Sequence, residues 1–158
     1  MSISASDVIN MLMPLTSFGN RKDDCTAFKN MIKNTPNKLA IQVSDELLLN
    51  VSKYKKFISI TKAKSILTEV YLIATGLTEG QYILLRASIF LALKNASKKN
   101  RDELYKTIDL LEEGKNYQAK LLYGVNKRGV MKLGEELKEM IKNDKKLRED
   151  YVRYGIGG

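Results

Sequence analysis

Apolar residues recur every three or four positions along most of this chain, and lysines fill the positions between them. Such spacing places the apolar side chains on one face of an α-helix and the charged side chains on the other. The pattern predicts a mainly α protein of about six helices in a single globular domain spanning residues 1–158. Polar residues suited to cap these helices at their N-termini include Ser6, Ser44, Thr61 and Thr78.

The segment 79–95 is the most apolar of the expected helices. Only Glu79, Arg86 and Lys94 are charged within it, and Thr78 and Gln81 have the spacing of a capping box. A helix that is apolar nearly all round is usually buried by its neighbours. We therefore expect residues 79–95 to form a central helix.

Two segments alternate between apolar and polar residues instead. Residues 39–43 are too few to distinguish a strand from part of a helix. Residues 117–123 also alternate, and the Asn-Lys-Arg-Gly sequence that follows suits a tight turn. The pattern favours a small β-hairpin over residues 117–133 with a basic tip. The alternative is an all-α bundle in which this segment is a helix interrupted by glycine.

The residues that most enzyme active sites need are scarce. The chain has no histidine, and its one cysteine, Cys25, is expected to be a small core residue. Gly124 and Gly129 have the spacing that begins a Walker motif, but Val130 and Met131 stand where lysine and serine or threonine are required. We expect no enzymatic activity, no cofactor, no metal site and no small-molecule substrate.

The net charge of +9 is the strongest indication of function. Three stretches contain no acidic residue, between Glu46 and Glu69, between Glu79 and Asp102, and between Glu113 and Glu135, and each holds five basic residues. Excess positive charge of this kind favours a polyanionic partner, although it can also serve only to keep a protein soluble. Lysine outnumbers arginine 21 to 6, which together with abundant isoleucine and asparagine is typical of AT-rich viral or phage genomes.

The leading hypothesis is a nucleic-acid-binding protein that contacts the phosphate backbone with little sequence specificity, the choice between DNA and RNA being open. The expected contacts are Lys53, Lys55, Lys56, Lys98, Lys99, Arg101, Lys120, Lys127, Arg128 and Lys132. A winged helix with residues 101–113 as recognition helix is disfavoured, because that segment holds two basic and five acidic residues.

The ends of the chain suggest a rival class, a helical protein–protein interaction module such as a viral adaptor, an inhibitor or a self-assembling coat subunit. Asp7 is the one charged residue within residues 1–19. We expect Val8, Met11 and Leu12 to contribute to an oligomerisation arm in this segment. Residues 153–158 are expected to be a flexible tail. The apolar run from Tyr82 to Leu93 is too short to cross a bilayer, so we expect an intracellular or virion location.

Overall fold

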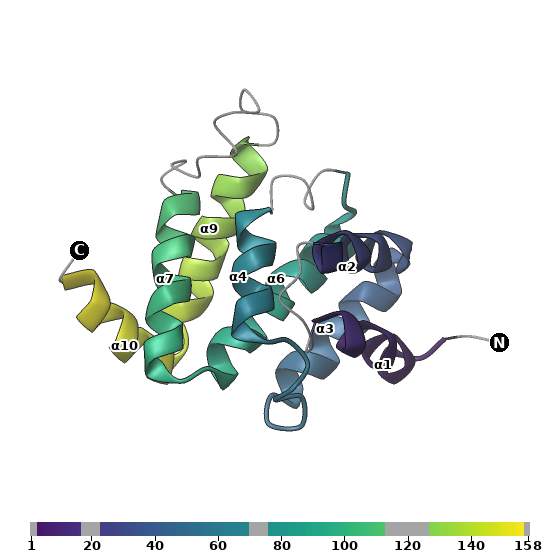
Figure 1. The fold of residues 1–158 in the computed structure, drawn as a ribbon, viewed down its shortest axis with the longest axis horizontal. Coiled ribbons are helices and arrows are strands. Elements are labelled where there is room, and N and C mark those ends of the chain that lie inside the picture. Colours follow the sequence, from purple (N-terminus) through teal and green to yellow (C-terminus); the bar gives the residue numbers. More distant parts are fainter. Residues whose placement is uncertain (1–2, 17–22, 70–75, 113–126, 157–158) are drawn as a thin grey trace.

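The computed structural model describes residues 3–16, 23–69, 76–112 and 127–156 (Figure 1). These segments contain helices and turns but no strand, so the mainly α prediction is confirmed and the count of about six is too low. The described helices are α1 (Ala5–Thr16), α2 (Asp23–Asn34), α3 (Asn37–Leu49), α4 (Ile60–Thr68), α6 (Glu79–Asn95), α7 (Lys98–Glu112), α9 (Lys127–Lys142) and α10 (Lys145–Ile156).

Helix α6 is the central helix that the sequence predicts. Eleven of its 17 residues are buried, and Thr78 and Gln81 form the expected capping box at its N-terminus. Helices α2, α3, α4 and α9 all pack against it. Figure 1 shows α1, α2 and α3 on one side of the molecule and α7, α9 and α10 on the other, with α4 and α6 between them.

The start of α6 is joined closely to the turn between α2 and α3. The main-chain N–H of Gly80 donates to Asn37 Oδ1 at 2.6 Å, and Gln81 Nε2 donates to the carbonyl oxygens of Lys33 and Thr35 at 3.1 and 2.9 Å. A Cβ atom on Gly80 would overlap with the main-chain carbonyl of Asn37. Only glycine therefore allows the two backbones to approach this closely.

The predicted β-hairpin over residues 117–133 is wrong. Residues 127–133 are the first two turns of α9, and the remainder of the expected hairpin lies outside the described residues. The physical reason is a helical stripe: Leu133, Leu137 and Ile141 recur every four residues, and all three are fully buried. Burial of this stripe decides the structure of the segment.

Three of the expected helix starts also differ. Helix α1 begins at Ala5, before the expected cap Ser6, and the hydroxyl of Ser4 accepts from the N–H of Asp7 at 3.2 Å. Residues 39–43 belong to α3, which runs through Ser44, and the Ser44 hydroxyl donates to the carbonyl of Ala40 at 2.8 Å. Helix α4 is capped by Ser59, whose hydroxyl accepts from the N–H of Lys62 at 3.0 Å, two residues before the expected Thr61. Serine and threonine both suit N-caps, so residue type alone did not distinguish the two positions.

Candidate nucleic-acid interface

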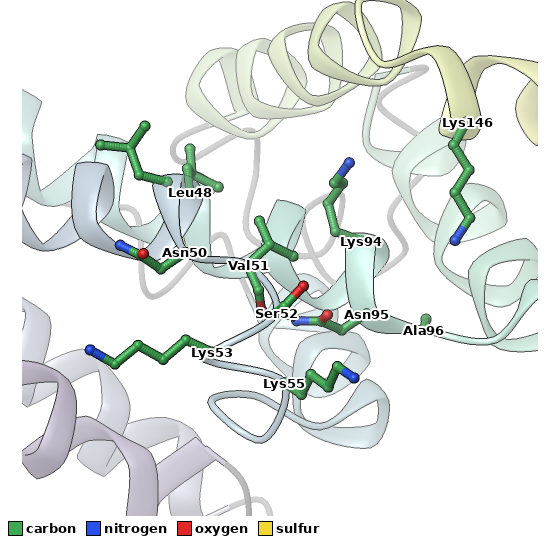
Figure 2. A pocket seen from close by; sticks show the side chains of 11 residues that line it. Leu48, Asn50, Val51, Ser52, Lys53, Lys55, Lys94, Asn95, Ala96 and Lys146 are labelled. Atoms are coloured by element: carbon green, nitrogen blue, oxygen red, sulfur yellow. Dashed lines mark hydrogen bonds between the residues drawn. The ribbon is translucent and has the colours of Figure 1, made fainter.

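A surface groove lies where α3 and α6 end and α10 begins (Figure 2). It encloses about 870 Å³ and is lined by four lysines, which we call the groove lysines: Lys53, Lys55, Lys94 and Lys146. Two of the acid-free stretches supply the first three, and α10 supplies the fourth. None of the described residues that line the groove is acidic. The groove therefore brings positive charge from three distant parts of the sequence to one place.

The connection between α3 and α4 holds two of these lysines outward. Tyr54 and Phe57 are buried in the core, and the Tyr54 hydroxyl donates to Glu46 Oε1 at 2.8 Å. Burial raises the pKa of the Tyr54 hydroxyl, and the neighbouring Glu46 carboxylate adds to this effect. With Tyr54 and Phe57 held inside, the intervening Lys55 and the preceding Lys53 are exposed to solvent.

Two asparagine amides fasten this connection to the rest of the fold. Asn50 Nδ2 donates to the carbonyl of Glu46 at 3.1 Å, one turn back in α3. Asn95 Nδ2 donates to the carbonyl of Val51 at 3.2 Å and so links the end of α6 to the connection. Both amides line the groove, and Figure 2 shows Asn95 beside Ser52 near its centre. The groove is thus held by hydrogen bonds on two sides.

The groove lysines differ in how far their charge is compensated. Lys94 Nζ lies 2.6 Å from Asp144 Oδ2, and Lys53 Nζ lies 4.0 Å from Glu46 Oε1. Lys55 and Lys146 make no ion pair with a described residue. These two amines carry the largest uncompensated charge of the groove and are the most favourable positions for an anionic group.

Asp144 also sets the position of Lys146. Its Oδ1 accepts from the N–H of Leu147 at 3.0 Å, which caps the start of α10. Burial on its own would raise the pKa of the Asp144 carboxyl, but hydrogen bonds from Lys94 and from the main chain of α10 outweigh it, and the pKa is lowered. Asp144 is therefore a charged link between α6 and α10.

The stretch around residue 98 is divided between the surface and the core. Lys98 and Lys99 are exposed at the start of α7, two and three residues after Ala96, which lines the groove. Arg101 is buried: it pairs with Asp150, and its Nη1 donates to the carbonyl of Ala96 at 2.6 Å. The Arg101 guanidinium is therefore used within the fold, in contrast to the expectation that it contacts phosphate.

Lys132, the basic residue of the third stretch whose side chain is described, lies away from the groove. Lys132 is exposed, lies 3.7 Å from Glu136 and sits over the ring of Tyr82 near the start of α6. Tyr82 and Asn95 are 13 residues apart on α6, which corresponds to about 20 Å. Lys127 and Arg128 begin α9 but their side chains are not among the described ones, and Lys120 lies outside the described residues.

Lys53, Lys55, Lys98 and Lys99 were expected from the sequence, as was the exposed Lys56, whereas Lys94 and Lys146, which also line the groove, were not. Lys146 lies in a segment of mixed charge and gives no signal as part of a basic stretch. The Asn143-Asp144 cap could have placed it in the first turn of a new helix. Because Lys146 and Lys55 are far apart along the chain, the sequence gives no sign that both line the same groove.

The expected oligomerisation residues are also divided. Val8 and Leu12 lie in the chain's own core, where α1 packs against α2 and α3, so they are not available to a second copy. Met11 lies at the edge of this buried face of α1, with 45% of its surface exposed. Only Met11 of the three can contribute to association.

No family model matches this chain, and no curated protein or solved structure matches it either. Within the described segments, no helix is long and apolar enough to cross a membrane. The same segments hold no group of three or more side chains suited to bind a metal ion.

Proposed function

We propose that this protein binds nucleic acid through the phosphate backbone, without enzymatic activity, and that the lysine-lined groove is the principal contact. The main support for this proposal is that Lys53, Lys55, Lys94 and Lys146 line the same groove, and that no described residue of the lining is acidic. Phosphates bound there would release counterions, which makes binding favourable and strongly salt-dependent. Lys98 and Lys99, next to the groove, would extend the contact along the strand.

The lysine contacts favour low sequence specificity. Ammonium groups on flexible stems recognise charge and not the pattern of base edges. The lysine-rich composition supports an origin in an AT-rich virus or phage, in which such a protein would act in packaging, replication or regulation.

The test is fluorescence anisotropy with labelled single-stranded and double-stranded oligonucleotides across about 50 to 300 mM salt. Wild type is expected to bind with micromolar or tighter affinity and a log-log salt slope of several units. The double variant Lys55→Glu/Lys146→Glu should bind at least about tenfold more weakly, with a slope reduced by about one to two units. Both residues are exposed, so the fold should be retained.

Lys38→Glu provides the matched control. Lys38 is exposed at the first turn of α3, about 15 Å along that helix from the groove, and makes no ion pair with a described residue. Its reversal should change affinity only slightly. A loss in Lys38→Glu equal to that in the single variant Lys55→Glu, which changes the net charge by the same amount, would show that net charge, and not the groove, determines binding.

Self-association is a second proposal, favoured by the exposed apolar side chains of Ile3 and Met11 at the N-terminal end of the chain. Because Val8, Ile9 and Leu12 are core residues, removing α1 would unfold the protein and could not test it. Met11→Asp leaves the core intact and should convert an oligomer to a monomer in sedimentation velocity. An unchanged sedimentation coefficient would exclude this face of α1 from the interface.

A further inference from the structure

The groove is not lined by lysines alone. Leu48, Leu49 and Val51 form an apolar wall beside the amines, and Leu49 is 81% exposed. Leu49 is the most exposed large apolar side chain in the described part of the molecule. A bare anion gains nothing from such a wall, whereas a ligand with an apolar face covers it and removes it from water.

The two groove amides add hydrogen-bond acceptors. Asn50 and Asn95 each use Nδ2 in a bond to a main-chain carbonyl, and neither Oδ1 accepts a hydrogen bond from a described residue. A carbonyl oxygen repels a phosphate oxygen but accepts from the N–H groups on the Watson–Crick edge of an unpaired base, which in thymine is the ring N3–H. The lining therefore matches a ligand that combines an anionic group, hydrogen-bond donors and a flat apolar surface.

We infer that the groove binds an unpaired nucleotide of a single strand, with its phosphate among the groove lysines and its base against Leu49. This inference rests on the proposed function and specifies its ligand. The groove is open to solvent and has a volume of about 870 Å³, which is enough for a base and its phosphate. In a duplex the bases are paired and stacked, and bringing one out costs a few kcal/mol, so a single strand is the favoured substrate.

The experiment compares three labelled probes: two single strands of equal phosphate number, about 12 nucleotides long and in the length range of common single-strand sites, and a duplex of the same length with about twice the phosphates. They are an oligothymidylate, a strand of the same length with abasic sites in place of all bases, and a duplex. Oligothymidylate should bind about five- to tenfold more tightly than the abasic strand, as expected when a leucine side chain is covered. The duplex should bind more weakly than oligothymidylate.

Leu49→Ser is the decisive variant, and its exposure means that the fold should not depend on it. It should weaken oligothymidylate binding to the level of the abasic strand and leave abasic binding unchanged. Leu110→Ser is the matched control, because Leu110 is 46% exposed on α7 and does not line the groove. Thermal unfolding followed by circular dichroism checks that both variants fold.

The possible failures are distinguishable. Equal affinities for oligothymidylate and the abasic strand, equal weakening of both by Leu49→Ser, or tighter binding of the duplex would overturn the nucleotide site while leaving phosphate binding in place. Absence of binding to all three probes at low salt would overturn the proposed function as well. Displacement of oligothymidylate by polyglutamate of matched charge, at the same concentration as by unlabelled oligothymidylate, would instead identify a site for acidic peptides.

Discussion

Arg101 in α7 and Asp150 in α10 form an ion pair in which only 7% of each side chain is exposed. Removing one member of a buried pair leaves a charge in a poorly solvated place. We expect Arg101→Met to lower the free energy of unfolding by about 3 kcal/mol, measured by urea denaturation. Lys99→Met, an exposed change in the same turn of α7, should have little effect.

The Arg101–Asp150 ion pair also allows a test of which basic residues stabilise the fold and which bind nucleic acid. Because Arg101 is used within the fold, folded Arg101→Met should bind oligonucleotides about as well as wild type, whereas Lys55→Glu should not. A loss of affinity without a loss of stability in Arg101→Met would contradict this assignment.

Gly80→Ala should destabilise the protein, because the new methyl group would meet the carbonyl of Asn37. The helices α3 and α6 would have to move apart, at a cost of about 1 to 3 kcal/mol in the free energy of unfolding. The Asn37→Ala background should not relieve the loss, since the contact is with main chain. Recovery of stability in the double variant would show that the Asn37 side chain, and not its carbonyl, is the obstacle.

The link between Lys94 and Asp144 predicts a dependence of stability on pH. The pKa of Asp144 is lowered in the folded protein, so the charged carboxylate stabilises the fold at neutral pH. This contribution is lost as pH falls from the ordinary aspartate pKa of 3.8 through the lower folded value. Asp144→Asn should therefore be less stable than wild type at neutral pH, with a difference in unfolding free energy that shrinks in strong acid. A difference independent of pH would assign the effect to packing.

The start of α4 can be tested by two alanine substitutions. Ser59→Ala should lower stability by about 1 kcal/mol, since its hydroxyl accepts the N–H of Lys62. Thr61→Ala, inside the first turn and exposed, should be neutral or slightly stabilising because alanine favours helix. The reverse order in thermal unfolding would place the cap at Thr61.

The central helix could be predicted from the sequence because its signals are local. Residues 79–95 are nearly uniformly apolar, and the capping box needs only Thr78 and Gln81. The hairpin prediction assumed that the strand-like alternation of residues 117–123 continues on the other side of the turn. It failed because Leu133 is part of the helical stripe that also contains Leu137 and Ile141. A stripe that begins before Gly134 is visible in the sequence, but its burial depends on α7, which packs against α9.

The groove was only half predictable. Acid-free stretches identified Lys53 and Lys55, but nothing in the sequence places Lys146 near them. That proximity depends on the packing of α10 against α7 and α9 and on the bond between Asp144 and Lys94. Likewise, the burial of Arg101 follows from Asp150, 49 positions later in the chain. Residue type does not distinguish the groove lysines from a cation such as Arg101 that pairs within the fold. Tertiary packing decides which basic side chains remain exposed.

The position of α6 in the middle of both the fold and the chain has a consequence for biosynthesis. Helices α1 to α3 leave the ribosome first, and the apolar surface that α3 buries against α6 has no partner until residue 95 has been added. Helices α7 to α10 then complete the opposite side. The nascent N-terminal half therefore carries an uncovered apolar face for the time needed to synthesise about 45 further residues, several seconds at cellular rates, during which a chaperone can bind it.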